Sequence, residues 1–207
     1  MAINLDYAPG ATPLDPDEAA GLIPSHITTQ GQLNEWEAQN IIAGEQWARN
    51  HTPATKRGAK KYVTVIDEKF MRDLHKSMFN KTWKWAGQFR LTEKNIGVAP
   101  HHITSRLRDL AEDVKLQLTA SSMPLNEIAA RFHHRLVAIH LFANGNGRHA
   151  RLMTDLLLVE RGGPAFTWGG RNLVQASAVR ARSIDALRAA DRRDMGPLLK
   201  FVMAGNS

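Results

Sequence analysis

Residues 140–151 read HLFANGNGRHAR, and this stretch decides how the whole chain is interpreted. A histidine closes one apolar run, a loop of glycines and asparagines follows, and Arg148 and Arg151 open the next apolar run. Glycines let consecutive backbone N–H groups face one concavity, and such a nest binds anions. A helix that begins near Gly147 would point its positive end into the same concavity, so the stretch predicts an anion-binding site.

The side chains of this stretch add chemistry to the anion site. Arg148 and Arg151 are three residues apart, so on a helix they share a face and can fork onto phosphate oxygens. His140 titrates near neutral pH and can take a proton from a hydroxyl. A phosphate cradle beside a base indicates phosphoryl or nucleotidyl transfer. The alternative is a glycine turn between two core helices with a buried histidine, but the combined spacing favours function.

The stretch resembles the Fic motif, H-x-F-x-(D/E)-G-N-G-R-x-x-R, at every defined position but one. The matching residues are His140, Phe142, Gly145, Asn146, Gly147, Arg148 and Arg151. A pattern of this length is far more specific than an isolated glycine motif. The resemblance implies an all-α Fic fold, a helical bundle whose enzymes move AMP from ATP to a protein hydroxyl and release pyrophosphate.

The resemblance also implies a role for each matching residue. His140 would be the general base, and Phe142 would be a core anchor that fixes the loop. Residues 145–147 would form the anion hole, and Arg148 and Arg151 would hold the phosphates of ATP. On this basis we expect a protein adenylyltransferase.

Asn144 stands where the family has an acid that ligates magnesium. The resemblance implies ATP as substrate and Mg²⁺ as its cofactor, with Asn144 as the metal ligand. A neutral carbonyl oxygen is a weaker magnesium ligand than a carboxylate, although the ATP phosphates and water supply further ligands. The alternatives are an enzyme of reduced activity, one that removes AMP, and one that uses another phosphate donor.

A second segment carries the resemblance beyond the motif. Residues 74–90 resemble the Fic segment that ends in W-A-G-x-x-R, and the likeness runs from about residue 67 to 203. Residues 91–100 stand where Fic proteins carry a β-hairpin flap, and apolar residues alternate about Gly97 as in a short hairpin. In the family the flap pairs with an extended target segment. We therefore expect the target protein to dock near residues 91–100; the alternative is a plain connecting loop.

The whole sequence is most similar to the Fic subgroup called mobile mystery protein B, which implies a partner of the mobile mystery protein A type. Many Fic proteins are inhibited by a glutamate in the pattern (S/T)-x-x-x-E-(G/N), which engages the second motif arginine, here Arg151. This chain has no clean match, since Glu37 has Leu33 four residues before it and Ala38 directly after it.

Apolar periodicity and end signals predict a chain of helices. Asp67 is a predicted helix cap, and Thr29 with Gln32 forms a predicted capping box. The predicted helices cover residues 29–49, 67–80, 104–119, 125–140, 147–161, 172–190 and 194–204. Together with the hairpin and an N-terminal extended arm, they define the expected fold.

Charge divides the chain into an acidic N-terminal part and a basic remainder. Residues 1–50 hold seven acidic residues and one basic residue, which gives this part a net charge of −6. Because the net charge of the whole chain is +7, the other residues carry a net charge of +13. We expect residues 1–50 to form the arm and first helix, and residues 51–207 to form the Fic domain. The arm, residues 1–26, carries four acids and no lysine or arginine. Either it docks near the flap or cradle and restrains activity, or it covers a core face elsewhere.

The composition of the chain limits the classes of protein to which it can belong. With 207 residues, of which 43% are apolar, the chain can bury one sizeable core, and without cysteine it has no disulfide framework. No stretch of about 18 apolar residues is present, so we expect no membrane contact and a cytoplasmic location. The basic body suits polyanions such as nucleotides, and nucleic acid is not an expected partner.

Two other classes of function compete with adenylyl transfer. The first is a binding or regulatory module without catalysis, which the basic body and Asn144 favour. The second is a Doc-like kinase, in which the loop ends in a lysine and lacks the second glycine. Gly147 and Arg148 argue against the kinase, because the arginine leaves room and donors for the β- and γ-phosphates.

Overall fold

The computed structural model describes residues 12–52, 64–120, 122–169 and 176–204, and these residues form helices with no β-ladder. The helices are α1 (Pro16–Ala19), α2 (Gln30–His51), α3 (Glu68–Phe79), the 3₁₀ turn η2 (Pro100–His102), α4 (Ile103–Ala120), α5 (Leu125–Ile139), α6 (Asn146–Glu160), α7 (Ala176–Asp191) and α8 (Gly196–Met203). The all-α prediction is confirmed for this part of the chain. The first residues of the predicted helix 172–190 lie outside the described residues.

Two helix starts follow the predicted end signals. Thr29 accepts a hydrogen bond from the Gln32 backbone N–H at 3.3 Å, and the Gln32 side chain accepts from the Thr29 N–H at 3.2 Å. The Asp67 carboxylate accepts from the backbone N–H groups of Lys69 at 2.7 Å and Phe70 at 3.3 Å. Each side chain satisfies N–H groups that a helix leaves unpaired, which is why the two boundaries could be predicted.

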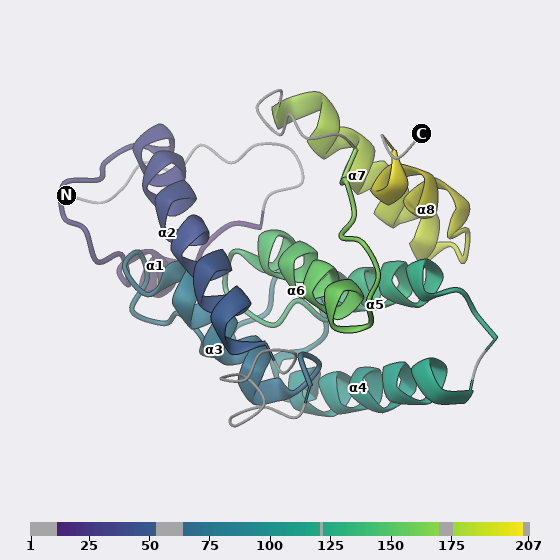
Figure 1. Cartoon of the computed structure of the whole chain (residues 1–207). Coiled ribbons are helices and arrows are strands. Elements are labelled where there is room, and N and C mark those ends of the chain that lie inside the picture. Colours follow the sequence, from purple (N-terminus) through teal and green to yellow (C-terminus); the bar gives the residue numbers. More distant parts are fainter. Residues whose placement is uncertain (1–11, 53–63, 121, 170–175, 205–207) are drawn as a thin grey trace.

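The helices pack in a bundle in which α5 and α6 lie side by side (Figure 1). α4 packs on α5, α2 packs along α3, and α3 reaches α6, so the first core lies among these five helices. Its largest fully buried side chains include Phe70, Phe79, Trp83, Phe132 and Phe142. A second, smaller core joins α7 and α8 to α5 and α6.

Residues 91–100 form an irregular loop in place of the predicted hairpin. The buried guanidinium of Arg90 donates to the backbone carbonyls of Thr92 at 2.8 Å and His140 at 2.6 Å, and also to that of Val98. The Val98 N–H donates to the Ile139 carbonyl at 3.3 Å. The backbone groups of the loop therefore form hydrogen bonds with the end of α5 and with Arg90, and not with each other as in a hairpin.

The described part of the predicted arm, from residue 12 onward, lies against the segment that precedes this loop. The Trp85 indole N–H donates to the Glu18 carbonyl at 2.9 Å, and the Lys84 N–H donates to the Gly21 carbonyl at 2.9 Å. Lys94, whose side chain is 2% exposed, pairs with Asp15 at 2.9 Å and with Glu18. Asp15, the N-cap of α1, and Glu18 within α1 thus contact the loop itself. Residues 1–11 lie outside the described residues.

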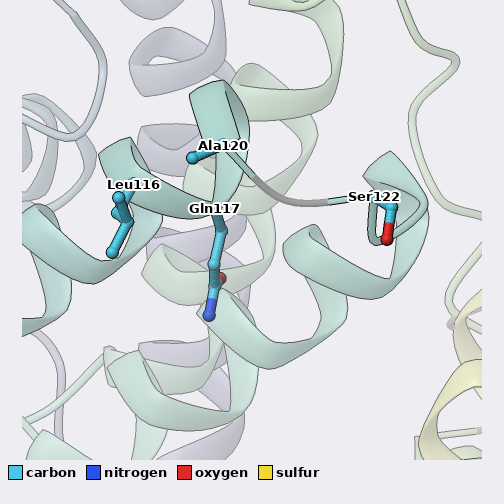
Figure 2. Close-up of a pocket in the computed structure, with 4 residues that line it drawn as sticks. All are labelled: Leu116, Gln117, Ala120 and Ser122. Atoms are coloured by element: carbon cyan, nitrogen blue, oxygen red, sulfur yellow. The ribbon is translucent and has the colours of Figure 1, made fainter.

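A surface depression of about 470 Å³ lies at the end of α4, lined by Leu116, Gln117, Ala120 and Ser122 (Figure 2). Ser122 precedes the start of α5, whereas His140 follows its end, so a helix of about 22 Å separates the depression from the motif. Among the described residues, no helix is long and apolar enough to span a bilayer.

Candidate active site

His140 directly follows α5 as its C-cap, and its backbone is in a left-handed conformation with φ 58° and ψ 68°. A non-glycine residue adopts this region at a cost, which persists only where the surroundings enforce it. Arg90 enforces it here by binding the His140 carbonyl. Gly97 also packs on the histidine, since a Cβ at residue 97 would lie 2.7 Å from the His140 Cβ.

The imidazole of His140 is buried, and neither ring nitrogen makes a hydrogen bond of standard geometry with a described residue. Burial, with the nearby charges of Arg90 and Lys94, lowers the pKa of His140 to about 4, although the Val137 backbone opposes this shift. The ring is therefore neutral at physiological pH with a free lone pair, which is the state that a general base requires.

The loop that follows is closed from inside by Asn146. Its side-chain oxygen accepts from the Phe142 N–H at 2.9 Å, and its amide donates to the Phe142 carbonyl at 2.7 Å. Gly145 precedes α6 at φ 78°, and a Cβ there would lie 2.6 Å from the Phe79 ring. The Asn146 side chain is thus engaged within the loop, so only its backbone N–H is available for an anion.

The first turn of α6 presents the predicted anion cradle. The backbone N–H groups of Asn146, Gly147 and Arg148 have no intrahelical acceptor, as at any helix start, and no other described residue accepts from them. A Cβ at Gly147 would meet nothing within 4 Å, so the space beside it is open. The Gly145 N–H is different, because the Asn144 side-chain oxygen accepts from it at 2.6 Å.

The two motif arginines differ in their surroundings. Arg148 donates to Glu37 at 2.6 Å, and its guanidinium lies 5.0 Å from the centre of the Phe79 ring. Arg151 makes no ion pair within 4 Å of any described residue, and burial, followed by the charges of Arg148 and Arg180, lowers its pKa, while the more distant charge of Asp155 partly offsets that shift. A largely buried cation without a directly bonded counter-ion is costly, and a bound anion would reduce that cost.

Asn144 can serve magnesium only in part. Its side-chain oxygen is neutral and already accepts from Gly145, so one lone pair remains for an ion. The described residues contain no cluster of three or more histidine, aspartate or glutamate side chains that could hold a metal. Asn144 thus fits magnesium as one weak ligand among phosphate and water oxygens.

Glu37, which the sequence analysis set aside because its flanking residues do not match the inhibitory pattern, is a site residue in the structure. It is 3% exposed on the inner face of α2, where it accepts from the Trp83 indole N–H at 2.8 Å and from Arg148. It contacts the first motif arginine, whereas the family's inhibitory pattern concerns the second. An acid on a stripe shared with Leu33 and Ala48 is a signal that could have indicated a buried ion pair.

Removal of the Glu37 charge should strengthen nucleotide binding. In Glu37→Gln the amide oxygen still accepts from Trp83, but Arg148 loses its counter-charge and becomes available to phosphate. We expect ATP to bind several-fold more tightly, for a gain of about 1 kcal/mol in calorimetry. Glu35→Gln, on the exposed face of the same helix, is the matched control. Unchanged or weaker binding in Glu37→Gln would show that Glu37 does not compete with phosphate.

Burial of four histidines should make the fold sensitive to acid. Burial lowers the pKa of His133 to about 3 and that of His149 to about 4, as it does for His140, and it also lowers the pKa of His75. The unfolded chain therefore binds more protons below about pH 6.5, and the free energy of unfolding falls as pH falls toward 4. Asp155, whose pKa burial raises to about 6, opposes this trend more weakly.

We expect each histidine to cost on the order of 2 kcal/mol of stability at pH 5 relative to pH 7. Circular dichroism melts from pH 7.5 to 5 measure the effect, and His133→Gln should flatten the profile. A melting temperature that stays constant or rises toward pH 5 would contradict the burial of neutral histidines.

Comparison with solved structures shows that the fold is a Fic fold. An N-terminal Fic domain from Bartonella quintana, solved with ADP, matches with a TM-score of 0.64 and 19% identity, covering 86% of each chain. An effector protein from Bartonella tribocorum, solved with AMPPNP, matches with a TM-score of 0.63 and 18% identity, covering 86% of this chain and 87% of that one.

Residues 65–158 match the Fic/DOC family, so the chain contains a Fic/DOC family domain. Its curated relatives include protein adenylyltransferase fic-1 of Caenorhabditis briggsae, 31% identical over 121 residues, and that of Caenorhabditis elegans, 30% identical over 121 residues. Each alignment covers 56% of this chain and 22% of the relative. The chain thus spans about a fifth of the length of these relatives.

Proposed function

We propose that this protein is an adenylyltransferase that moves AMP from ATP to a hydroxyl side chain of a target protein. The observation that carries the proposal is a neutral, unpartnered His140 next to an open anion cradle flanked by the unpaired Arg151. Similarity to relatives named protein adenylyltransferase supports it, as do similar folds that hold ADP and AMPPNP.

In this proposal His140 removes the proton from the target hydroxyl, and the oxygen attacks the α-phosphorus of ATP. The bond from the α-phosphorus to the bridging oxygen breaks, and pyrophosphate leaves with that oxygen. Arg148, Arg151 and the N–H groups at the start of α6 hold the phosphates and stabilise the developing charge. Magnesium, with Asn144 as one weak ligand, would neutralise part of the phosphate charge when bound.

The loop of residues 91–100 is our proposed docking site for the target. It packs on His140 through Gly97, and it leaves Leu91 90% exposed and Ile96 46% exposed. Exposed apolar side chains beside a catalytic base suit an extended protein segment.

We also propose that the protein belongs to the mobile mystery protein B subgroup and has a partner of the A type. The proposal further includes a cytoplasmic location and a domain division at residue 50.

Incubation with α-labelled ATP, magnesium and cell lysate tests the function. We expect labelled protein bands, with AMP found on a serine, threonine or tyrosine by mass spectrometry. Tight ATP binding without labelled bands would favour the alternative of a regulatory module, which the neutral Asn144 and the Glu37–Arg148 pair support. Faster loss of AMP from a labelled target would favour the reverse reaction.

Asn144→Asp should increase the affinity of the site for magnesium. A carboxylate at this position adds a charged oxygen ligand, which a hard cation prefers to a neutral carbonyl. We expect half-maximal transfer at a lower magnesium concentration, with an equal or higher maximal rate, measured in magnesium titrations of label transfer. A clear loss of activity would mean that the amide does something other than ligate the metal weakly.

A further inference from the structure

His75 lies fully buried on α3, between the segment that contains Gly87 and the loop that leads into α6. Its Nδ1 is 3.0 Å from the Gly87 backbone nitrogen, and its Nε2 is 3.1 Å from the Asn144 carbonyl oxygen. Its ring stacks on Phe142 with 3.7 Å between ring centres and an angle of 21°. One side chain therefore joins three separate parts of the chain.

The hydrogen bonds fix the tautomer of His75. A backbone N–H can only donate, so Nδ1 must be the unprotonated, accepting nitrogen. The single proton of the neutral ring is then on Nε2, which donates to the Asn144 carbonyl. Burial, with the nearby His149, keeps the pKa of His75 well below its usual value, in agreement with a neutral ring.

Gly87 provides a fixed support for this arrangement. Its φ of +80° favours glycine, and a Cβ there would lie 2.8 Å from the Arg72 carbonyl oxygen. Arg72 donates to the Gly87 carbonyl at 3.0 Å, while His75 accepts from the Gly87 N–H. Both polar groups of residue 87 are therefore held by α3.

The Asn144 end determines how the catalytic loop is oriented. In a planar trans peptide the carbonyl and the next N–H point in opposite directions. With the Asn144 carbonyl held toward α3 by His75, the Gly145 N–H points away from α3, where the Asn144 side-chain oxygen accepts it. The same peptide leads directly into the free N–H groups of Asn146 and Gly147.

We propose that His75 is a positioning residue, whose Nε2–H holds the Asn144–Gly145 peptide so that the cradle and the Asn144 side chain face the nucleotide. The proposal rests on the adenylyltransferase function for its kinetic consequence. If His75 only filled space in the core, the shape of its ring would be sufficient. A positioning role needs the donor at Nε2.

Two isosteric substitutions separate these roles. In His75→Gln the amide nitrogen reaches the place of Nε2 and can donate to Asn144. In His75→Asn the shorter side chain reaches only the place of Nδ1 and can accept from Gly87. We expect His75→Asn to lower kcat about 10- to 100-fold with little change in KM for ATP, because both motif arginines remain. His75→Gln should retain most of the kcat of the parent protein.

Two further readouts accompany the kinetics. The ¹⁵N amide resonances of Gly145 and Gly147 should shift in His75→Asn and stay close to parent positions in His75→Gln. Val114→Ala, which truncates a buried side chain of α4 and leaves a cavity, is the control for destabilisation. It should lower the melting temperature without loss of kcat.

Equal losses of kcat in the two His75 variants, in step with their melting temperatures, would overturn the proposal. An unchanged Gly145 resonance in His75→Asn would overturn it too. If the parent protein transfers no label, the adenylyltransferase function fails, and the amide resonances alone decide the role of His75.

Discussion

His140→Ala is expected to lower the rate of AMP transfer by about 10²- to 10⁴-fold while ATP still binds. The imidazole is the unpartnered base beside the cradle, whereas the phosphates are held by the start of α6 and its arginines. Loss of the base therefore removes an interaction of the transition state and leaves ground-state binding in place. Label transfer measures the rate, and calorimetry measures ATP affinity in the same preparation.

His102→Ala is the matched control for this variant. His102 is an exposed histidine in η2, at the far end of the loop of residues 91–100, and its removal should leave transfer unchanged. A rate near that of the parent protein in His140→Ala would show that another group takes the proton. Loss of ATP binding in the same variant would show that His140 holds the nucleotide.

Arg151→Ala is expected to weaken ATP binding by about 10- to 150-fold, which corresponds to about 1.5–3 kcal/mol for charge-assisted bonds to phosphate. Arg148→Ala should have a smaller effect, because Arg148 already shares its charge with Glu37. Isothermal titration with ATP measures both. Arg106→Ala, on the exposed face of α4, removes the same charge from a helix that does not form the cradle and serves as control.

Unchanged ATP affinity in both motif variants would contradict the phosphate cradle. An effect as large in Arg106→Ala would instead indicate general attraction by the basic surface. Salt separates these cases, because long-range attraction is screened whereas direct contacts in a partly buried site are screened much less.

The helical fold could be predicted from sequence because its signals are local. Thr29 and Asp67 cap helices through groups within three residues, and the apolar stripes of α3 and α5 face the core as their spacing predicts. The residues of the candidate site could also be predicted from sequence, because residues 140–151 are contiguous.

What the sequence did not reveal depends on contacts between distant residues. Glu37 and Arg148 are 111 positions apart, and neither signals the other in a linear pattern. The expected hairpin did not form because Arg90 and the end of α5 hold the backbone of the loop. The inward turn of the Asn146 side chain likewise depends on the closed geometry of the loop.

Transfer from ATP labelled at either the α- or the γ-phosphate, measured side by side on the same target with His140→Ala as blank, distinguishes adenylyl transfer at His140 from the competing reactions. We expect label on protein from the α-position, none from the γ-position, and none in the blank. Label from the γ-position would mean kinase chemistry, and equal α-label in the blank would mean that the site built around His140 does not carry the reaction.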